Sequence, residues 1–321
     1  MEFFRSVNVD WLGKKWYFLA FSMIFSVAGI ISMCMHYASS GAIVPLGVDF
    51  RGGTEVQVQF QSSPDLSQIR SATSAAGIKD ASVVPYDVPS SNQVLIGLPE
   101  TQDETSLDVG RQRIVDALKS HYGNPFTVRN VQVVGPTVGK QLEKQAGLAT
   151  LYSMLGMLVY LWFRFQLIYG VAAVVACFHD TLITVGAFAL TNQEISLTVI
   201  AAILTLVGYS MNDTIVVFDR IRENLRLSRR ESLPDVVNRS INQTLSRTVL
   251  TSGLTFLTVL SLYVFGGAVL RGFSFALVVG ILIGTYSSIA VAAPMLVAWQ
   301  ERRGNQGGGT TSLPVAKRAR G

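Results

Sequence analysis

Six long apolar segments alternate with polar stretches along the chain. They span Trp16–Tyr37, Gly147–Phe163, Leu167–Leu190, Ile195–Phe218, Thr248–Gly267 and Gly272–Trp299. About 20 helical residues cross a hydrocarbon core of about 30 Å, and each segment is close to that length. Trp16, Tyr17, Trp162 and Trp299 fall at segment ends, where interfacial aromatic residues belong. The pattern predicts a polytopic α-helical membrane protein with six transmembrane helices.

Residues 38–144, between the first and second apolar segments, are hydrophilic, and their apolar positions recur in short runs with the spacing of strands or short helices. Alternating positions predict strands over Thr54–Phe60, Ala81–Tyr86, Gln93–Leu98 and Thr127–Val134. Helical spacing with a glycine stop predicts helices over Asp65–Ala76 and Ser106–His121. The order βαββαβ is that of a ferredoxin-like α+β domain. We expect it to serve as a positioning or binding module, because it contains no nucleophile–base pair and no metal-ligand spacing.

A double glycine precedes the first predicted strand, in the sequence Asp49-Phe50-Arg51-Gly52-Gly53. It favours a tight turn or a close backbone approach over a phosphate-binding loop, since no lysine follows in register. No cofactor motif or metal site is predicted anywhere in the chain, and we expect the protein not to be an enzyme.

The composition supports a membrane protein. The chain is 49% hydrophobic and 15% charged, with a mean hydropathy of +0.39, whereas soluble domains carry about 25% charged residues. Cys34 and Cys177 lie within apolar segments, which favours free buried thiols over a disulfide. The pI of about 9.3 could indicate nucleic acid binding, but the positions of the basic residues have a better explanation.

Most of the 26 Lys and Arg residues fall on one side of a six-pass topology: residues 1–15, Arg164, the link between the fourth and fifth segments, and the tail. The opposite short links contain only Arg271. The positive-inside rule therefore predicts cytoplasmic termini, with residues 38–144 as an extracytoplasmic domain and residues 145–299 as transmembrane helices 2–6. Residues 300–321 are predicted to form a disordered basic tail attracted to the membrane surface.

An alternative for the first segment is a signal peptide, with Ala38-Ser39-Ser40-Gly41 as the cleavage region. A signal-peptide core contains about 7–15 apolar residues, and this segment is longer. We therefore predict that it stays in the mature protein as transmembrane helix 1.

Ionisable residues interrupt three of the apolar segments. His179 and Asp180 lie in the third, Asn212 and Asp213 in the fourth, and Arg247 opens the fifth. Each charge at the centre of a membrane helix costs roughly 2.5–3.5 kcal/mol on insertion scales. A chain that retains several of them is expected to bring them together in its interior. They serve either as structural polar contacts between helices or, the interpretation we favour, as a relay for protons or ions.

Helical spacing places further polar residues beside these groups. The supporting polar positions are Tyr209, Ser210, Thr248, Thr251, Ser252 and His179. In the last segment, Gly280 and Gly284 form a GxxxG pattern with Ser287 and Ser288 one turn later, which allows close helix packing. Three polar faces on three different segments predict one shared intramembrane site.

The depth of two residues suggests a mechanism. Asp213 and Arg247 both fall in the inner halves of their segments, so we expect them to form an ion pair that protonation of Asp213 would break. Asp180 is predicted to be either a second relay station or a structural partner of a neighbouring helix. Asn212 belongs to the same predicted proton relay, and the sequence leaves both protons and sodium ions open as the coupling ion.

Several stretches resemble a known family. They are Gly47–Thr54, Val134–Gly139, His179-Asp180, Val207–Asn224 and Arg247–Gly253. With these motifs the chain resembles the SecF side of the SecD/SecF family of bacterial protein-translocase subunits, which amounts to half of a resistance–nodulation–division (RND) transporter. Arg51 and Met211 differ from some relatives, and neither lies among the relay residues.

The resemblance implies the partners and the function. The partners would be SecD with a second set of six spans, the SecYEG translocon, the candidates YajC and YidC, a translocating preprotein and membrane lipid, with no nucleic acid. The chain would lie in the bacterial inner membrane and use proton-motive force in late preprotein translocation, with Asp213 and Arg247 carrying the coupling. The alternatives are half of an RND exporter of small solutes, which would need a second homologous half, and a structural scaffold of a membrane complex.

Overall fold

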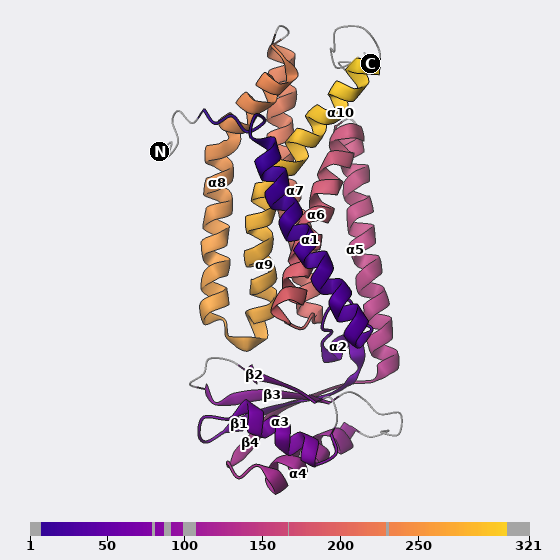
Figure 1. Ribbon diagram of the computed structural model, residues 1–321, viewed down its shortest axis with the longest axis vertical. Helices are drawn as coiled ribbons and strands as arrows, with labels where there is room; N and C mark the ends of the chain where they lie inside the picture. Colours follow the sequence, from indigo (N-terminus) through magenta and orange to yellow (C-terminus); the bar gives the residue numbers. More distant parts are fainter. Residues whose placement is uncertain are drawn as a thin grey trace, which may run out of the picture.

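The computed structural model describes residues 8–78, 81–86, 91–98, 107–165, 167–228 and 231–306. A bundle of long helices stands on a small sheet domain, and the start of α1 and the end of α10 both lie at the far end, away from the sheet (Figure 1). The bundle consists of α1 (Lys15–Ser40), α5 (Pro136–Arg164), α6 (Leu167–Thr191), α7 (Leu197–Leu227), α8 (Leu233–Phe265), α9 (Gly267–Ser287), the π-helix η2 (Ser288–Ala292) and α10 (Ala293–Gln306). Within the described residues six spans are long and apolar enough to cross a membrane, which confirms the predicted architecture.

Several helices are longer than their apolar segments. α5 begins at Pro136, a position that suits proline because the first helical N–H needs no partner. α8 begins after Ser232, whose side chain caps the helix, so Arg247 lies inside α8 and not at its start. α10 continues past Trp299 into the segment predicted to be disordered, and the tail beyond Gln306 lies outside the described residues.

The last span contains one irregular turn. Pro294 has no N–H, and its ring crowds the carbonyl of Ala290 four residues earlier, so a regular α-helix is unfavourable there. The chain widens into η2 immediately before this proline. Ser287 and Ser288, at the start of the π turn, are fully buried and face the interior of the bundle.

The sheet domain has the predicted element order. It comprises β1 (Gly53–Phe60), α3 (Leu66–Ala75), β2 (Ser82–Tyr86), β3 (Gln93–Leu98), α4 (Leu107–His121) and β4 (Phe126–Val134), and the short α2 (Val48–Arg51) precedes it. The strands lie in the order β2-β3-β1-β4 with every neighbouring pair antiparallel. α3 and α4 cover the sheet face that points away from the bundle, burying residues such as Val56, Ile96 and Leu118 (Figure 1). The ferredoxin-like assignment of this domain stays a prediction.

The double glycine forms the predicted tight turn between α2 and β1. Gly52 has a φ of 76° and Gly53 a φ of 129°, values that residues with a Cβ rarely adopt. A Cβ on Gly139 of α5 would lie 2.6 Å from the carbonyl oxygen of Phe50, so the start of α5 packs directly on the α2 backbone. Phe50 is itself buried in the apolar core of the bundle, which anchors the sheet domain to the helices.

α1 touches the rest of the bundle mainly along one seam with α6. Ser22, Gly29 and His36 recur every seven residues, the repeat that keeps one helix face against a neighbour. His36 Nε2 lies 3.0 Å from the carbonyl oxygen of Ala189, and Gly29 meets Gly186 backbone to backbone. The opposite face of α1 is exposed and includes Cys34, whereas Cys177 of α6 is buried; both thiols are free, and the predicted burial of Cys34 is wrong.

Gly186→Ala is expected to destabilise the protein by about 1–3 kcal/mol, because an added Cβ would lie 2.7 Å from Gly29 Cα and force the two helices apart. Gly156→Ala is the matched control, since a Cβ there meets nothing and helix propensity favours alanine by about 1 kcal/mol. Thermal unfolding of the purified protein in detergent measures the change in stability of both variants. A midpoint for Gly186→Ala at or above that of the wild type would show that the seam is not tightly packed.

Candidate functional site

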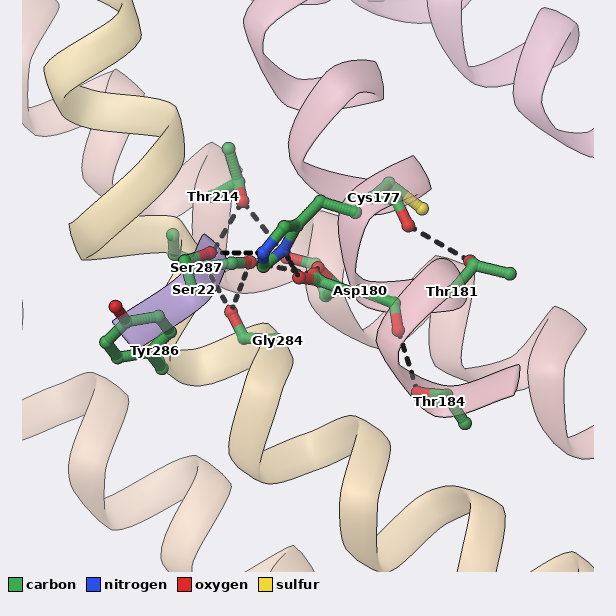
Figure 2. Close-up of polar contacts among 12 residues, drawn as sticks. Ser22, Cys177, Asp180, Thr181, Thr184, Thr214, Gly284, Tyr286 and Ser287 are labelled. Atoms are coloured by element: carbon green, nitrogen blue, oxygen red, sulfur yellow. Dashed lines mark hydrogen bonds and ion pairs between the residues drawn. The ribbon is translucent and has the colours of Figure 1, made fainter. Parts of the chain in front are cut away.

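Asp180 lies in the middle of α6 at the centre of a buried hydrogen-bond network. Its Oδ2 accepts hydrogen bonds from the hydroxyls of Ser210 in α7, at 2.5 Å, and of Ser287 in α9, at 2.7 Å. Its Oδ1 lies 3.0 Å from Nδ1 of His179, and the carboxylate is only 1% exposed. Figure 2 shows the Asp180 and Ser287 side chains directed toward each other from facing helices. The site therefore joins α6, α7 and α9 through one carboxylate.

The network extends to a fourth helix through His179. Its Nε2 is hydrogen-bonded to Ser22 Oγ of α1, and Ser22 is one of the few buried residues of that helix. Imidazole can carry a proton between its two nitrogens, so Ser22, His179 and Asp180 form a continuous chain of groups able to exchange protons. The same contacts also fix α1 against the bundle.

Asp213 lies in the middle of α7 and is 2% exposed. Its Oδ2 accepts a hydrogen bond from Ser252 Oγ of α8 at 2.6 Å and has a longer contact of 3.5 Å to Thr285 Oγ1 of α9. Within the described part of the chain its partners are neutral hydroxyls, and no ion pair forms. A carboxylate in this setting gains or loses a whole charge whenever it exchanges a proton.

The predicted ion pair between Asp213 and Arg247 is absent from the described residues. Arg247 precedes Ser252 by five residues, which turns it about 140° around α8 from the side chain that reaches Asp213. Its side chain is exposed on the surface of the bundle. Asn212 is also exposed, because it lies about 100° around α7 from Asp213. Neither Arg247 nor Asn212 makes a hydrogen bond or ion pair with a buried carboxylate in the described part of the chain, although the charge of Arg247 still acts on Asp213 from a longer distance. Their part in the relay stays a prediction.

The predicted supporting residues divide into two groups. Ser210, Ser252 and His179 contact the carboxylates directly, as described above. Tyr209 and Thr251 instead join α7 to α8, since the Tyr209 hydroxyl donates to the Thr251 carbonyl oxygen at 3.3 Å. Thr248 lies one turn from Ser252 and is 2% exposed, and its hydroxyl has no hydrogen-bond partner within the described residues.

Several residues of the site were not predicted as relay or supporting positions. Ser22, Thr285 and Ser287 each contribute a hydroxyl from α1 or α9, helices that carry no acidic or basic residue near the site. The GxxxG pattern was a signal for α9, because a Cβ on Gly284 would lie 3.1 Å from Ser210 Cβ. α9 therefore approaches α7 closely enough for Ser287 to reach Asp180. Nothing in the sequence indicated a role for Ser22, because a single serine in an apolar segment does not distinguish a buried contact from an exposed position.

The two carboxylates share their neighbouring helices. On α7, Ser210 binds Asp180 and Asp213 follows three residues later. On α9, Thr285 contacts Asp213 and Ser287 binds Asp180, just before the π turn. Any displacement of α7 against α9 must therefore alter the hydrogen bonds of both carboxylates. No group of three potential metal ligands occurs among the described residues.

Comparison with known proteins assigns the family. The profile described as "Protein export membrane protein SecD/SecF, C-terminal" matches residues 114–302, which include both carboxylates. The chain is 55% identical to the protein translocase subunit SecF of Koribacter versatilis, over 98% of this chain and 96% of that protein. The chain belongs to the SecD/SecF family. The SecF subunit of Desulfurispirillum indicum is 43% identical over 93% of this chain and 94% of its own length.

Two SecDF structures share the fold of this SecD/SecF chain. The crystal structure of SecDF from Thermus thermophilus matches with a TM-score of 0.80 and 36% identity over 92% of this chain. A second SecDF structure, in a super-membrane-facing form, matches with a TM-score of 0.68. The chain spans 39% and 40% of these two SecDF chains. The SecD/SecF GG motif matches residues 44–64, which contain the turn at Gly52 and Gly53.

Proposed function

We propose that this SecD/SecF chain couples the movement of protons across the membrane to a late step of preprotein translocation. The observation that carries the proposal is the pair of buried carboxylates, Asp180 and Asp213. Each is bonded to hydroxyls of other spans, and within the described residues neither forms an ion pair with Lys or Arg. Ionisable residues inside a bilayer are costly, and a structure that keeps two of them at adjoining helix contacts supports a proton relay.

Protons fit the geometry better than sodium ions. A sodium site needs several oxygen lone pairs converging on one point, whereas the hydroxyls around Asp180 direct their hydrogens toward the carboxylate. Protonation of either aspartate would remove a charge and weaken or reverse the hydrogen bonds that the carboxylate accepts. Because α7 and α9 contact both carboxylates, this change would favour a different packing of the helices. One elementary charge crossing the membrane field supplies about 2.3 kcal/mol per 100 mV.

Arg247 and Asn212 fit a site completed by another subunit. They lie on an exposed face of α7 and α8 that also carries Thr205, Thr251, Thr258 and Ser261. A charged guanidinium facing hydrocarbon is unfavourable, so this face calls for a polar partner within the membrane. Relatives of this family include SecDF proteins, of which this chain matches about two fifths. We infer that the partner is SecD and that its spans cover Arg247.

The distribution of charge supports the orientation. Arg164, Arg222, Arg226 and Arg239 lie at the far end of the bundle, where α5 and α7 end and α8 begins. By the positive-inside rule that end is cytoplasmic, and the sheet domain lies outside the bacterial inner membrane. There it would bind or position the emerging preprotein, with SecYEG as the channel and YajC and YidC as further members of the assembly.

Export into sealed vesicles tests the proposal. Vesicles containing this chain, SecD and SecYEG are given either a proton gradient or a sodium gradient of equal size, and protection of a preprotein from protease is measured. We expect the proton gradient to increase the protected fraction and a protonophore to remove the increase. Equal export with and without any gradient would identify the chain as a scaffold. Export that responds to the sodium gradient alone would identify sodium, and not protons, as the coupling ion.

A further inference from the structure

The sheet domain meets the bundle at the link between α6 and α7. The backbone N–H of Ile195 donates to the Pro45 carbonyl at 2.8 Å, and the N–H of Gly47 donates to the Ile195 carbonyl at 2.9 Å. This short parallel bridge ties the segment leading into the sheet to the segment leading into α7. Beyond it, side chains from the polar face of the sheet complete the contact.

One row of residues crosses the sheet at this contact, and we call it the Glu55 row. It consists of Ser82, Gly97, Glu55 and Gln132, on β2, β3, β1 and β4 respectively. At one end Ser82 Oγ donates to Glu194 Oε1 in the α6–α7 link at 2.8 Å. At the other end Gln132 Nε2 donates to Asp49 Oδ1 at 2.9 Å. The row therefore holds a carboxylate at each end and has a third carboxylate in its middle.

Both flanking carboxylates connect the row to α7. Glu194 lies in the link that precedes the helix, and Asp49 Oδ2 accepts a hydrogen bond from the Leu197 N–H in the first turn of α7, at 2.9 Å. Glu55 has no hydrogen-bond donor among the described residues. It borders a cavity of about 30 Å³ that is also lined by Arg51, Gly97 and Glu194, and such a cavity holds about one water molecule.

The surroundings of Glu55 disfavour its ionised form. Burial, followed by the nearby charges of Glu194 and then Asp49, raises the pKa of Glu55 from 4.5 to about 7. The basic group at the cavity is Arg51 of α2. β2, β3 and β4 contribute uncharged residues to the row, and α9, which touches β2, has its one charged residue, Arg271, over the ring of Tyr263.

We propose that the Glu55 row is a proton-sensitive contact that closes the sheet domain onto the start of α7 when Glu55 is protonated and opens when Glu55 ionises. A protonated Glu55 can donate a hydrogen bond to a flanking carboxylate, whereas an ionised one repels both. The contact depends on Asp49, Glu55 and Glu194, which lie where the sheet domain meets the bundle. The proposal therefore holds whether the spans carry protons or sodium ions. It would make the attachment of the sheet domain respond to the pH on that side of the membrane.

The sign follows from proton linkage. A carboxyl with a raised pKa in the closed contact holds its proton more tightly there than in the open form, where its ordinary value of 4.5 applies. Closure is therefore strongest at low pH and is lost as the pH rises from 4.5 through about 7. Between pH 5.5 and 8 the equilibrium constant for closure should fall on the order of tenfold.

Hydrogen exchange of the backbone bridge reports the contact directly. The full-length chain in lipid nanodiscs is exchanged between pH 5.5 and 8, and rates for peptides containing Gly47 and Ile195 are corrected for intrinsic pH dependence. We expect protection in the wild type to fall on the order of tenfold over this range, while a peptide from α3 stays constant. Constant protection at the bridge in the wild type would overturn the proposal.

Three variants assign the effect to Glu55. Glu55→Gln should give high protection of the bridge that no longer changes with pH. Glu194→Gln keeps an acceptor for Ser82 but removes a charge near Glu55, so the pH at which half of the protection is lost should fall. Glu143→Gln removes an exposed carboxylate of α5 near the sheet and should leave the wild-type midpoint unchanged. A wild-type midpoint in Glu55→Gln, or a lost pH response in Glu143→Gln, would refute the assignment.

Discussion

Replacing Asp213 with Asn is expected to reduce gradient-driven export to the level seen without a gradient. Asn fills the same space and its amide oxygen can still accept the hydrogen bond from Ser252, which Asp213 accepts at 2.6 Å. The variant should therefore fold and unfold like the wild type, with a change in thermal midpoint too small to explain lost export. What Asn lacks is a proton to exchange at neutral pH, so it cannot change charge during a transport cycle. Export into vesicles under an imposed proton gradient measures the effect.

Asp219→Asn is the matched control for this variant. Asp219 lies farther along the same helix, its side chain is 59% exposed, and it makes a weak 4.0 Å contact with Arg164. Exposed ion pairs of this kind contribute about 0–1 kcal/mol, so the control should retain full gradient-driven export. Undiminished export by Asp213→Asn would exclude this aspartate as the coupling group and leave Ser252 and Asp213 as a structural contact between α7 and α8.

Replacing Asp180 with Ala is expected to destabilise the bundle by roughly 2–5 kcal/mol, the largest loss of stability predicted for this chain. The substitution removes two interhelical hydrogen bonds, from Ser210 and Ser287, and each such bond in a membrane protein is worth about 0.6–1.7 kcal/mol. It also leaves His179, on the same helix, without its carboxylate partner, which costs about 1–3 kcal/mol more. Thermal unfolding in detergent gives the stability. Ser287→Ala removes one of the three contacts and should cost about a third as much, whereas Ser274→Ala removes a buried hydroxyl that bonds to its own helix and should cost less still.

Asp180→Asn separates the structural role from the relay role. The amide keeps an oxygen acceptor but cannot exchange a proton, so a stable variant with lost gradient-driven export would make Asp180 a second station of the relay. Stable folding with full export would make it a structural partner of α1, α7 and α9. If Asp180→Ala unfolds at the wild-type temperature, the hydrogen-bond network is not what joins these helices.

Most of the architecture was predictable because it depends on local periodicity. The six spans follow from apolar length, and the strands β1, β3 and β4 begin within one residue of their predicted starts. The turn at Gly52 and Gly53 was predictable because few residues other than glycine adopt its backbone angles. Helix ends were predicted less well, since α5 and α8 extend beyond the apolar segments into polar sequence that carries no hydropathy signal for a span.

Asp180 and Asp213 could be identified as candidates from the order of the residues alone, because hydropathy and charge are properties of single positions. The partners of each carboxylate could not be identified in this way, since they depend on the rotation and crossing of whole helices in the folded bundle. A turn of about 140° around α8 directs Ser252 toward Asp213 and leaves Arg247 on the surface, and the close approach of α9 at Gly284 brings Ser287 to Asp180.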